Sequence, residues 1–170
     1  FALSEGPGAP TAAGIQAKFD GSTLNGVKIP VTDGDCADWA VVVAKEGSGV
    51  SLVLVDLKQA GVTRTTLKTL DPTRGHAKIE FKGAKAERLG AGGQGWELAE
   101  AILDRAAVLL AFEQVGGSQA CLEMSTDYAK NRYAFSRQIG SFQAIKHKLA
   151  DMYVAIEVAL QVKPAVCIIS

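Results

Sequence analysis

The sequence is poor in the residues that build disulfide frameworks and metal centres. It contains three cysteines, Cys36, Cys121 and Cys167, which are widely separated and form no C-x-x-C pair. This pattern predicts buried thiols in a reducing compartment, and it favours neither a disulfide framework nor a zinc site. The two histidines, His76 and His147, lie far apart in the sequence, which does not favour a metal centre.

Net charge and long apolar runs are also lacking. Eighteen basic and eighteen acidic residues cancel, which removes the electrostatic argument for nucleic acid or an anionic membrane as the main partner. No apolar run approaches the ~20 residues of a membrane-spanning helix, and no secretory signal pattern is present. Apolar residues at 48% and charged residues at 21% are typical of a globular protein with one or two compact units.

The first half of the sequence has the pattern of short strands. The Asp-Gly pair at 20–21, the Asn-Gly pair at 25–26 and the glycine-rich stretch at 46–49 are typical of hairpin turns. Residues 77–81 alternate apolar and charged side chains, as in a strand with one buried face. Short strands without intervening helices predict an antiparallel β-sandwich or barrel domain over residues 1–90.

Two apolar stripes of helical period follow residue 90. The first comprises Leu98, Ile102, Leu109, Phe112 and Gly116, and it predicts a helix that runs on to Arg132. The second comprises Phe142, Ile145, Leu149, Met152 and Ile156. Ser141 precedes the second stripe and is expected to cap the first turn. The predicted fold class is therefore α+β, with a long antiparallel helical hairpin, part of a helical bundle, over residues 91–159.

Two glycine- and proline-containing stretches limit this helical region. Residues 90–95 have the spacing G-x-G-x-x-G of a dinucleotide-binding loop, but two helices follow it instead of a β–α–β unit, so we predict a flexible hinge. At the other end, Pro164 is expected to break the second helix. Residues 160–170, which include the β-like run 166–169, are therefore expected to form a tail of unclear structure.

The segment between the two helices carries the most specific motif. Residues 131–152 have the sequence NRYAFSRQIGSFQAIKHKLADM. By pattern alone this is a core helix with a solvated basic edge, or a joint whose cations and backbone donors hold an anion such as a pyrophosphate. The segment closely resembles the R-x-x-F-G-x-x-I-x-x-x-Q-x-x-x-x-x-L-A-D-M motif of acyl-CoA dehydrogenases, with Ser136 in place of the motif's glycine.

Two further segments resemble flavin-contacting parts of the same family. Residues 1–5, otherwise a strand that leaves into a loop, are similar to a segment aromatic-x-x-[Ser/Thr]-Glu, which implies that the backbone of Phe1 and Leu3 and the hydroxyl of Ser4 face the pyrimidine edge of FAD. Residues 24–32 are similar to L-N-G-x-K-x-W-I-T, which implies that Thr32 donates toward the hydride-accepting nitrogen. Two departures are plain: Pro30 replaces the tryptophan, and Pro-Thr at 10–11 replaces Ser-Asp.

The resemblance also assigns roles in the helical region. Asp104 matches an aspartate near the acyl-CoA chain, and Arg105 is a possible substitute for an arginine of the family; a solvent-facing Asp-Arg pair is the alternative. The matches Arg132, Phe135 and Gln143 imply contacts to a cofactor bound mainly by a neighbouring subunit, and hence a homo-oligomer. The resemblance implies a general-base glutamate beyond the end of this sequence in most members and at the position of Ala106 in others, so neither position is filled by a glutamate here.

The sequence opens without an initiator methionine and is therefore expected to come from a longer protein. The resemblances imply a function for that longer protein. The sequence is identified as the middle β domain and part of the C-terminal helical domain of an FAD-dependent acyl-CoA dehydrogenase. Such an enzyme desaturates an acyl-CoA thioester and passes electrons to an electron-transfer flavoprotein, in the bacterial cytoplasm or the mitochondrial matrix. The alternative is a non-catalytic structural or assembly subunit that has lost flavin chemistry.

Overall fold

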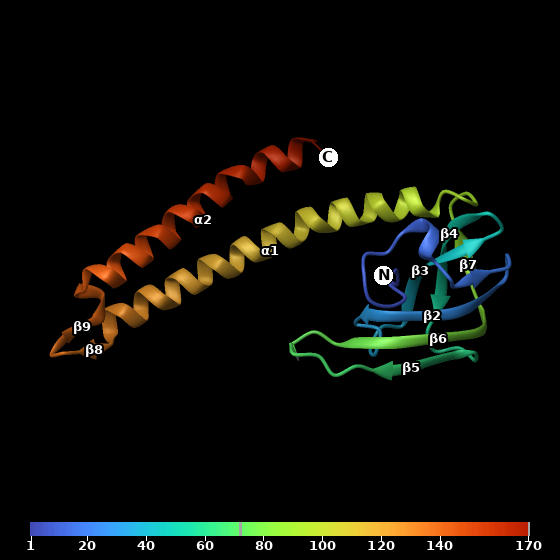
Figure 1. Ribbon diagram of the computed structural model, residues 1–170, viewed down its shortest axis with the longest axis horizontal. Coiled ribbons are helices and arrows are strands. Elements are labelled where there is room, and N and C mark those ends of the chain that lie inside the picture. The colour runs from blue at the N-terminus through green and yellow to red at the C-terminus, as the bar shows by residue number, and fades with distance from the viewer. Residues whose placement is uncertain (72, 170) are drawn as a thin grey trace. The chain divides into compact units, whose positions relative to one another are not determined.

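The chain forms two compact units, Phe1–Ala101 and the residues from Ile102 onward. The computed structural model describes residues 1–71 and 73–169, with side chains up to residue 161 (Figure 1). The first unit contains β1 (Lys18–Phe19), β2 (Thr23–Thr32), β3 (Trp39–Glu46), β4 (Gly49–Asp56), β5 (Val62–Thr66), β6 (His76–Lys85), β7 (Glu87–Leu89) and the 3-10 turn η1 (Ala12–Gly14). The remaining elements are α1 (Gly95–Asn131), β8 (Tyr133–Ala134), β9 (Arg137–Gln138), the 3-10 turn η2 (Ile139–Ser141) and α2 (Gln143–Ile169). The predicted α+β class is confirmed.

The seven strands of the first unit form one sheet in the order β5-β6-β2-β1-β3-β4-β7. Neighbouring strands pair antiparallel except β1 and β3, which pair parallel. The N-terminal segment enters the same sheet through parallel bridges from Ala2 to Val42 of β3 and from Glu5 to Ile29 of β2. It therefore lies between the two strands that β1 also joins.

Both faces of β3 and β4 are covered, which explains their continuous apolar runs. Val42 and Val53 pack into the larger core with Ile79 and Phe81 of β6. Val43 belongs to a second core on the other face, which also contains Ala99 of α1. On β6, Ala77, Ile79 and Phe81 are buried and the lysine and glutamate between them are partly exposed, so the predicted alternation at 77–81 is confirmed.

Two of the three predicted turns are confirmed. Residues 20–22 turn between β1 and β2, and the Asp20 carboxylate accepts from the N–H groups of Ser22 and Thr23. Residues 47–48 connect β3 to β4, with Gly47 at φ +59°. The turn predicted at 25–26 is wrong, because this pair lies inside β2 at a shift of the β2–β6 register. Gly26 has φ +142° there, so the pair forms a bulge and not a turn.

The glycine-rich stretch 90–95 leads from β7 into α1. The predicted hinge is packed against the sheet: the N–H of Gly93 donates to Ser51 Oγ at 3.2 Å, and a Cβ on Gly95 would lie 2.4 Å from the Cα of Ser51. β7 pairs antiparallel with β4, and a single long helix follows. The stretch therefore lacks the parallel β–α–β unit of a dinucleotide-binding fold.

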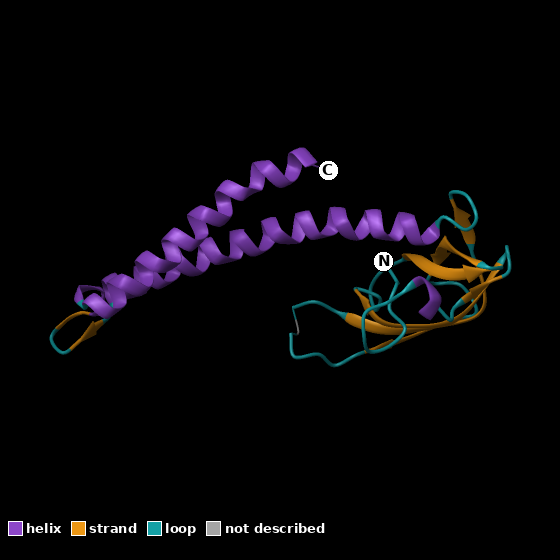
Figure 2. Cartoon of the chain, turned by 45° about the horizontal axis from the view of Figure 1, so that its top comes forward, coloured by secondary structure: helices purple, strands orange, loops and turns teal. Residues whose placement is uncertain are grey.

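The second unit is a helical hairpin, in which α2 returns alongside α1 after the short β8–β9 hairpin (Figure 2). α1 ends at Asn131, beside the predicted Arg132. The cap predicted at Ser141 is wrong, because its hydroxyl donates to the carbonyl of Gln138 at 2.7 Å. The break predicted at Pro164 is also wrong: α2 continues to Ile169, so the helix tolerates a residue that cannot donate to its ladder.

The cysteine prediction is corrected as well. Cys36 lies in the turn after β2 and Cys121 on the exposed side of α1, and both thiols are exposed instead of buried. The side chain of Cys167 lies outside the described residues. Among the helices in the described part of the chain, none is long and apolar enough to cross a membrane.

Candidate functional site

The N-terminal segment is anchored to β3 by its second residue. The N–H of Ala2 donates to the Val41 carbonyl at 2.8 Å, and its carbonyl accepts from the N–H of Val43 at 3.1 Å. Successive residues of an extended chain direct their backbone groups to opposite edges. The Leu3 carbonyl accepts instead from a side chain of β2, from Lys28 Nζ at 3.0 Å.

Ser4 and Thr32 are connected through β2. The carbonyl of Ser4 accepts from the N–H of Ile29 at 2.8 Å, and Thr32 is the last residue of the same strand. Three residues of strand separate Ile29 from Thr32, or roughly 10 Å. Ser4 is half-buried and Thr32 is exposed. Ser4 thus lies beside β2 and Thr32 lies at its end, at two separated points of the same strand.

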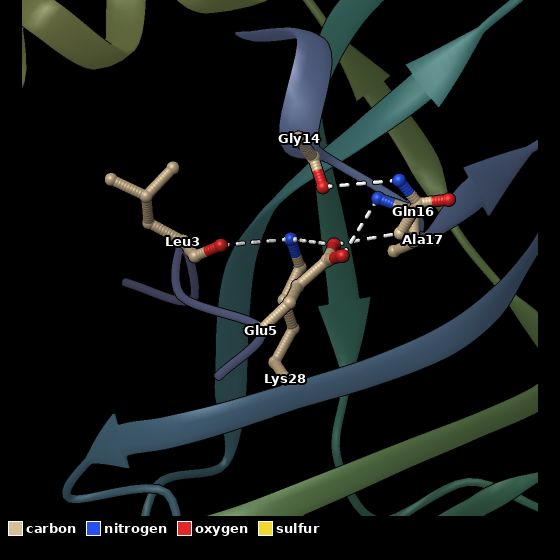
Figure 3. Close-up of polar contacts among 6 residues, drawn as sticks. All are labelled: Leu3, Glu5, Gly14, Gln16, Ala17 and Lys28. Atoms are coloured by element: carbon tan, nitrogen blue, oxygen red, sulfur yellow. Dashed lines mark hydrogen bonds and ion pairs between the residues drawn. The ribbon is translucent and has the colours of Figure 1, made fainter. Parts of the chain in front are cut away.

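A buried ion pair lies directly beneath this segment (Figure 3). Lys28 Nζ lies 2.7 Å from Glu5 Oε1, and the Lys28 side chain is 0% exposed. The Glu5 carboxylate also accepts from the N–H groups of Gln16 at 2.6 Å and Ala17 at 3.0 Å. Four hydrogen bonds thus tie together the N-terminal segment, β2 and the residues just before β1.

The two charges of this pair are perturbed for different reasons. Burial by itself raises the pKa of Glu5, but the bonds from Lys28, Ala17 and Gln16 outweigh it and hold that pKa below its ordinary value. Burial lowers the pKa of the Lys28 ammonium, and the hydrogen bond and charge of Glu5 oppose this shift. The surroundings of Glu5 therefore stabilise its ionised form.

A surface pocket adjoins this network. Its volume is about 560 Å³, and the loop of residues 6–11, together with Leu3–Glu5, Gly14–Ala17, Gly26 and Val27, forms its lining. Thr11, which stands where the family motif has an acidic residue, accepts from the N–H of Gly14 at 3.2 Å through its hydroxyl oxygen. Its hydroxyl hydrogen is therefore available to a neighbouring acceptor.

In the second unit, Arg132, Phe135 and Gln143 lie around the β8–β9 hairpin. Arg132 follows α1, and its carbonyl accepts from the N–H of Ile139 at 2.8 Å. Phe135 is 91% exposed at the tip of the hairpin, where its ring makes an edge contact with Phe142 at a centroid distance of 6.2 Å. Gln143 is exposed at the first residue of α2. The structure brings these three residues to one end of the unit.

A cation–π contact orders the same hairpin. The guanidinium carbon of Arg137 lies 3.9 Å from the centroid of the Phe142 ring. The ring is therefore contacted by Arg137 and by the edge of Phe135. Guanidinium groups beside the N-terminus of a long helix favour an anionic group such as a phosphate.

Asp104 and Arg105 lie on α1, away from that hairpin. Both side chains are exposed within the second unit, and adjacent helical residues point in different directions. Ala106, where the resemblance to the family implies the base of some members, has no ionisable group. The carboxylate of Glu100, one turn after Trp96, accepts from the indole N–H at 2.7 Å. No group of three or more histidine, cysteine, aspartate or glutamate side chains that could hold a metal occurs among the described residues.

Sequence reasoning missed the Lys28–Glu5 pair. Twenty-three positions separate the two residues, and no local pattern joins charges at that distance. One signal was present: Leu24, Lys28 and Val31 are the buried residues of β2, so a lysine occurs among buried apolar positions of this strand.

Comparisons with known proteins agree with this architecture. The family model of the "Acyl-CoA dehydrogenase, middle domain" matches residues 1–84, and that of the "Acyl-CoA dehydrogenase, C-terminal domain" matches residues 93–163. The acyl-CoA dehydrogenase IpdE2 of Mycobacterium tuberculosis is 33% identical over 161 residues, which cover 93% of this chain and 45% of that protein. The caffeyl-CoA reductase-Etf complex subunit CarC of Acetobacterium woodii is 34% identical over 94% of this chain and 46% of its own length.

A solved structure supports the same assignment. Butyryl-CoA dehydrogenase from Megasphaera elsdenii superposes with a TM-score of 0.87 at 31% identity, covering 98% of this chain and 48% of that chain. The chain thus spans about half the length of the curated relatives it matches. Two matched domains in succession, with a sheet unit followed by a helical hairpin, show that this chain belongs to the acyl-CoA dehydrogenase family.

Proposed function

We propose that this chain supplies the flavin-contacting part of an FAD-dependent acyl-CoA dehydrogenase, in which an acyl-CoA thioester is desaturated between its α and β carbons. FAD, when bound, supplies the acceptor for the hydride that leaves the β carbon. The observation that carries the proposal is the anchoring of residues 1–5 between β2 and β3, which connects Ser4 to the strand that ends at Thr32.

The residues of the first unit suit the edge of a flavin. The Ser4 carbonyl is bonded to the N–H of Ile29 in β2, and the hydroxyls of Ser4 and Thr32 are proposed to act as donors to the flavin, with the backbone of Phe1 and Leu3 beside them. Donors held in place by a sheet stabilise the negative charge that accumulates on a reduced flavin without having to reorganise. The pocket of about 560 Å³ beside Ser4 offers room for part of a nucleotide or thioester.

The residues of the second unit suit the anionic part of such a cofactor. Arg132, Phe135 and Gln143 gather where α2 begins, and a helix N-terminus offers backbone donors to a pyrophosphate. In the proposed assembly these residues contact the cofactor of a second copy of the chain. Asp104 and Arg105 are proposed to lie near the acyl-CoA chain, and the electron acceptor is proposed to be an electron-transfer flavoprotein, as the name of the related CarC complex suggests.

The alternative is a family member without flavin chemistry. Two observations favour it: Pro30 is exposed on β2 and offers no aromatic face at the position of the family's tryptophan, and Ala106 offers no carboxylate. The two functions differ in one measurable property, because only the enzyme requires FAD.

The visible spectrum of the purified chain, with and without added FAD, tests the proposal. Bound flavin that bleaches when acyl-CoA is added without oxygen would support an acyl-CoA dehydrogenase site. Ser4→Ala and Thr32→Val should each weaken FAD binding about tenfold, the loss that corresponds to one hydrogen bond. Thr65→Val, at an exposed position of β5, should leave it unchanged. A chain that takes up no FAD would favour the non-catalytic alternative.

A further inference from the structure

The loop of residues 6–15 forms much of the pocket wall but has little structure of its own. It contains the single 3-10 turn η1, which Thr11 caps by accepting from the N–H of Gly14. Most of its residues are exposed, and Ile15 at its end is buried. Glycines and prolines alternate through its first part. Such a loop depends on how its two ends are held, because few contacts within it oppose chain entropy.

A single carboxylate joins the two ends of the loop to each other. Glu5, the last residue before the loop, accepts from the N–H groups of Gln16 and Ala17, the first two residues after it. Figure 3 shows that Glu5 reaches across the base of the loop to these groups. The carboxylate therefore closes the loop through two hydrogen bonds between the residue before the loop and the two residues after it.

Lys28 determines where that carboxylate lies. Its ammonium donates to Glu5 Oε1 at 2.7 Å and to the Leu3 carbonyl at 3.0 Å. The side chain is fully buried, so water does not compete for these bonds. Two of the three ammonium donors thus fix the N-terminal segment at points on either side of Ser4.

We propose that Lys28 is a positioning residue, which acts through Glu5 to hold the loop of residues 6–15 and the Leu3–Glu5 backbone in the shape that forms the pocket. The identity of the pocket's ligand rests on the proposed function, but the closing of the loop does not. Apolar residues of similar volume that replace both members of a buried ion pair often cause little loss of stability. An apolar residue could not donate the two hydrogen bonds of Lys28, to Glu5 Oε1 and to the Leu3 carbonyl.

Hydrogen exchange of the full 170-residue chain tests the proposal, with the variants Lys28→Met, Glu5→Gln and the double variant. The amides of Gln16 and Ala17 report on loop closure, and that of Val53, paired in β3–β4, reports on global stability. We expect Lys28→Met to speed exchange at Gln16 and Ala17 about tenfold or more, as expected for weakening a charge-assisted hydrogen bond. Exchange at Val53 should change little.

The double variant separates positioning from simple packing. If Lys28 acts through Glu5, the double variant should exchange at Gln16 and Ala17 no faster than Glu5→Gln alone. Additive effects of the two substitutions would overturn the proposal. Unchanged exchange at Gln16 and Ala17 in Lys28→Met, or equal acceleration at Val53, would overturn it as well.

A titration with FAD on the same variants distinguishes this inference from the proposed function. If the wild-type chain binds FAD, Lys28→Met should weaken binding about tenfold and shift the visible band of the bound flavin. An unchanged affinity and band in a variant with a loosened loop would overturn the positioning role at the flavin site. A wild-type chain without FAD affinity would reject the proposed function, while the exchange data would still decide whether Lys28 closes the loop.

Discussion

Gly26 lies directly against the backbone of Ala17. A Cβ on Gly26 would come within 2.6 Å of the Ala17 Cα, and the φ of Gly26 is +142°. β1 and β2 pair antiparallel next to this contact, with Lys18 opposite Asn25. The close approach explains why an Asn-Gly pair, typical of a turn, occurs here inside a strand.

Substitution at this contact is expected to be costly. Gly26→Ala should lower the free energy of unfolding by about 2–4 kcal/mol, because overpacking against backbone adds to left-handed strain. Urea unfolding followed by circular dichroism measures the loss. Gly21→Ala is the matched control, since Gly21 also has a positive φ, of +100°, but a Cβ added there would meet no atom within 4 Å. Equal losses in both variants would contradict the contact with Ala17.

The start of α1 has a similar constraint. Gly95→Ala would place its Cβ 2.4 Å from the Ser51 Cα, which should destabilise the first unit by about 1–3 kcal/mol. Gly116→Ala, at an open position of the same helix, should instead stabilise the chain by about 1 kcal/mol. Thermal unfolding of the two variants measures both effects. A neutral Gly95→Ala would show that α1 begins without packing on β4.

The β8–β9 hairpin is expected to gain stability from the family's usual residue. Phe135 and Ser136 have φ values of +52° and +63°, as in a type I′ turn. Ser136→Gly should stabilise the second unit by about 1 kcal/mol, because glycine carries no penalty in this region. Ser118→Gly, inside α1, should destabilise it by about 0.5–1 kcal/mol. Unfolding of both variants in urea provides the comparison, and a loss in Ser136→Gly would rule out strain at the turn.

Protonation of Glu5 at low pH should break the Glu5–Lys28 ion pair. The pKa of Glu5 is lower in the folded state than in the unfolded chain, so the folded state binds fewer protons in the window between the two pKa values. The stability contributed by ionised Glu5 is present above the unfolded pKa and is lost as the pH falls through the folded pKa.

Glu5→Gln reproduces the protonated state at every pH. We expect it to be about 3 kcal/mol less stable than wild type near neutral pH, because it leaves Lys28 buried without a counter-charge. The difference should shrink as the pH falls below the ordinary pKa of a glutamate and through the lower pKa of folded Glu5. Unfolding free energies measured across this range test the prediction. A difference that stayed constant to the lowest pH would falsify the claim that Glu5 is ionised in the fold.

The sequence by itself determined the features that depend on near neighbours. The turn at 47–48, the alternation at 77–81 and the long helix that ends at Asn131 follow from local turn chemistry and hydrophobic period. The motif at 131–152 also predicted the family, which the comparisons confirm. The roles of Arg132, Phe135 and Gln143 toward a cofactor remain predictions.

Only the tertiary structure decided features that depend on residues distant in the chain. The bulge at Gly26 exists because Ala17 packs on it, and the break expected at Pro164 is absent from α2. The burial of Lys28 required Glu5 and the Leu3 carbonyl, which lie more than twenty positions away. A lysine can enter a core when a carboxylate and a carbonyl replace its water, and those partners come together only when the chain has folded.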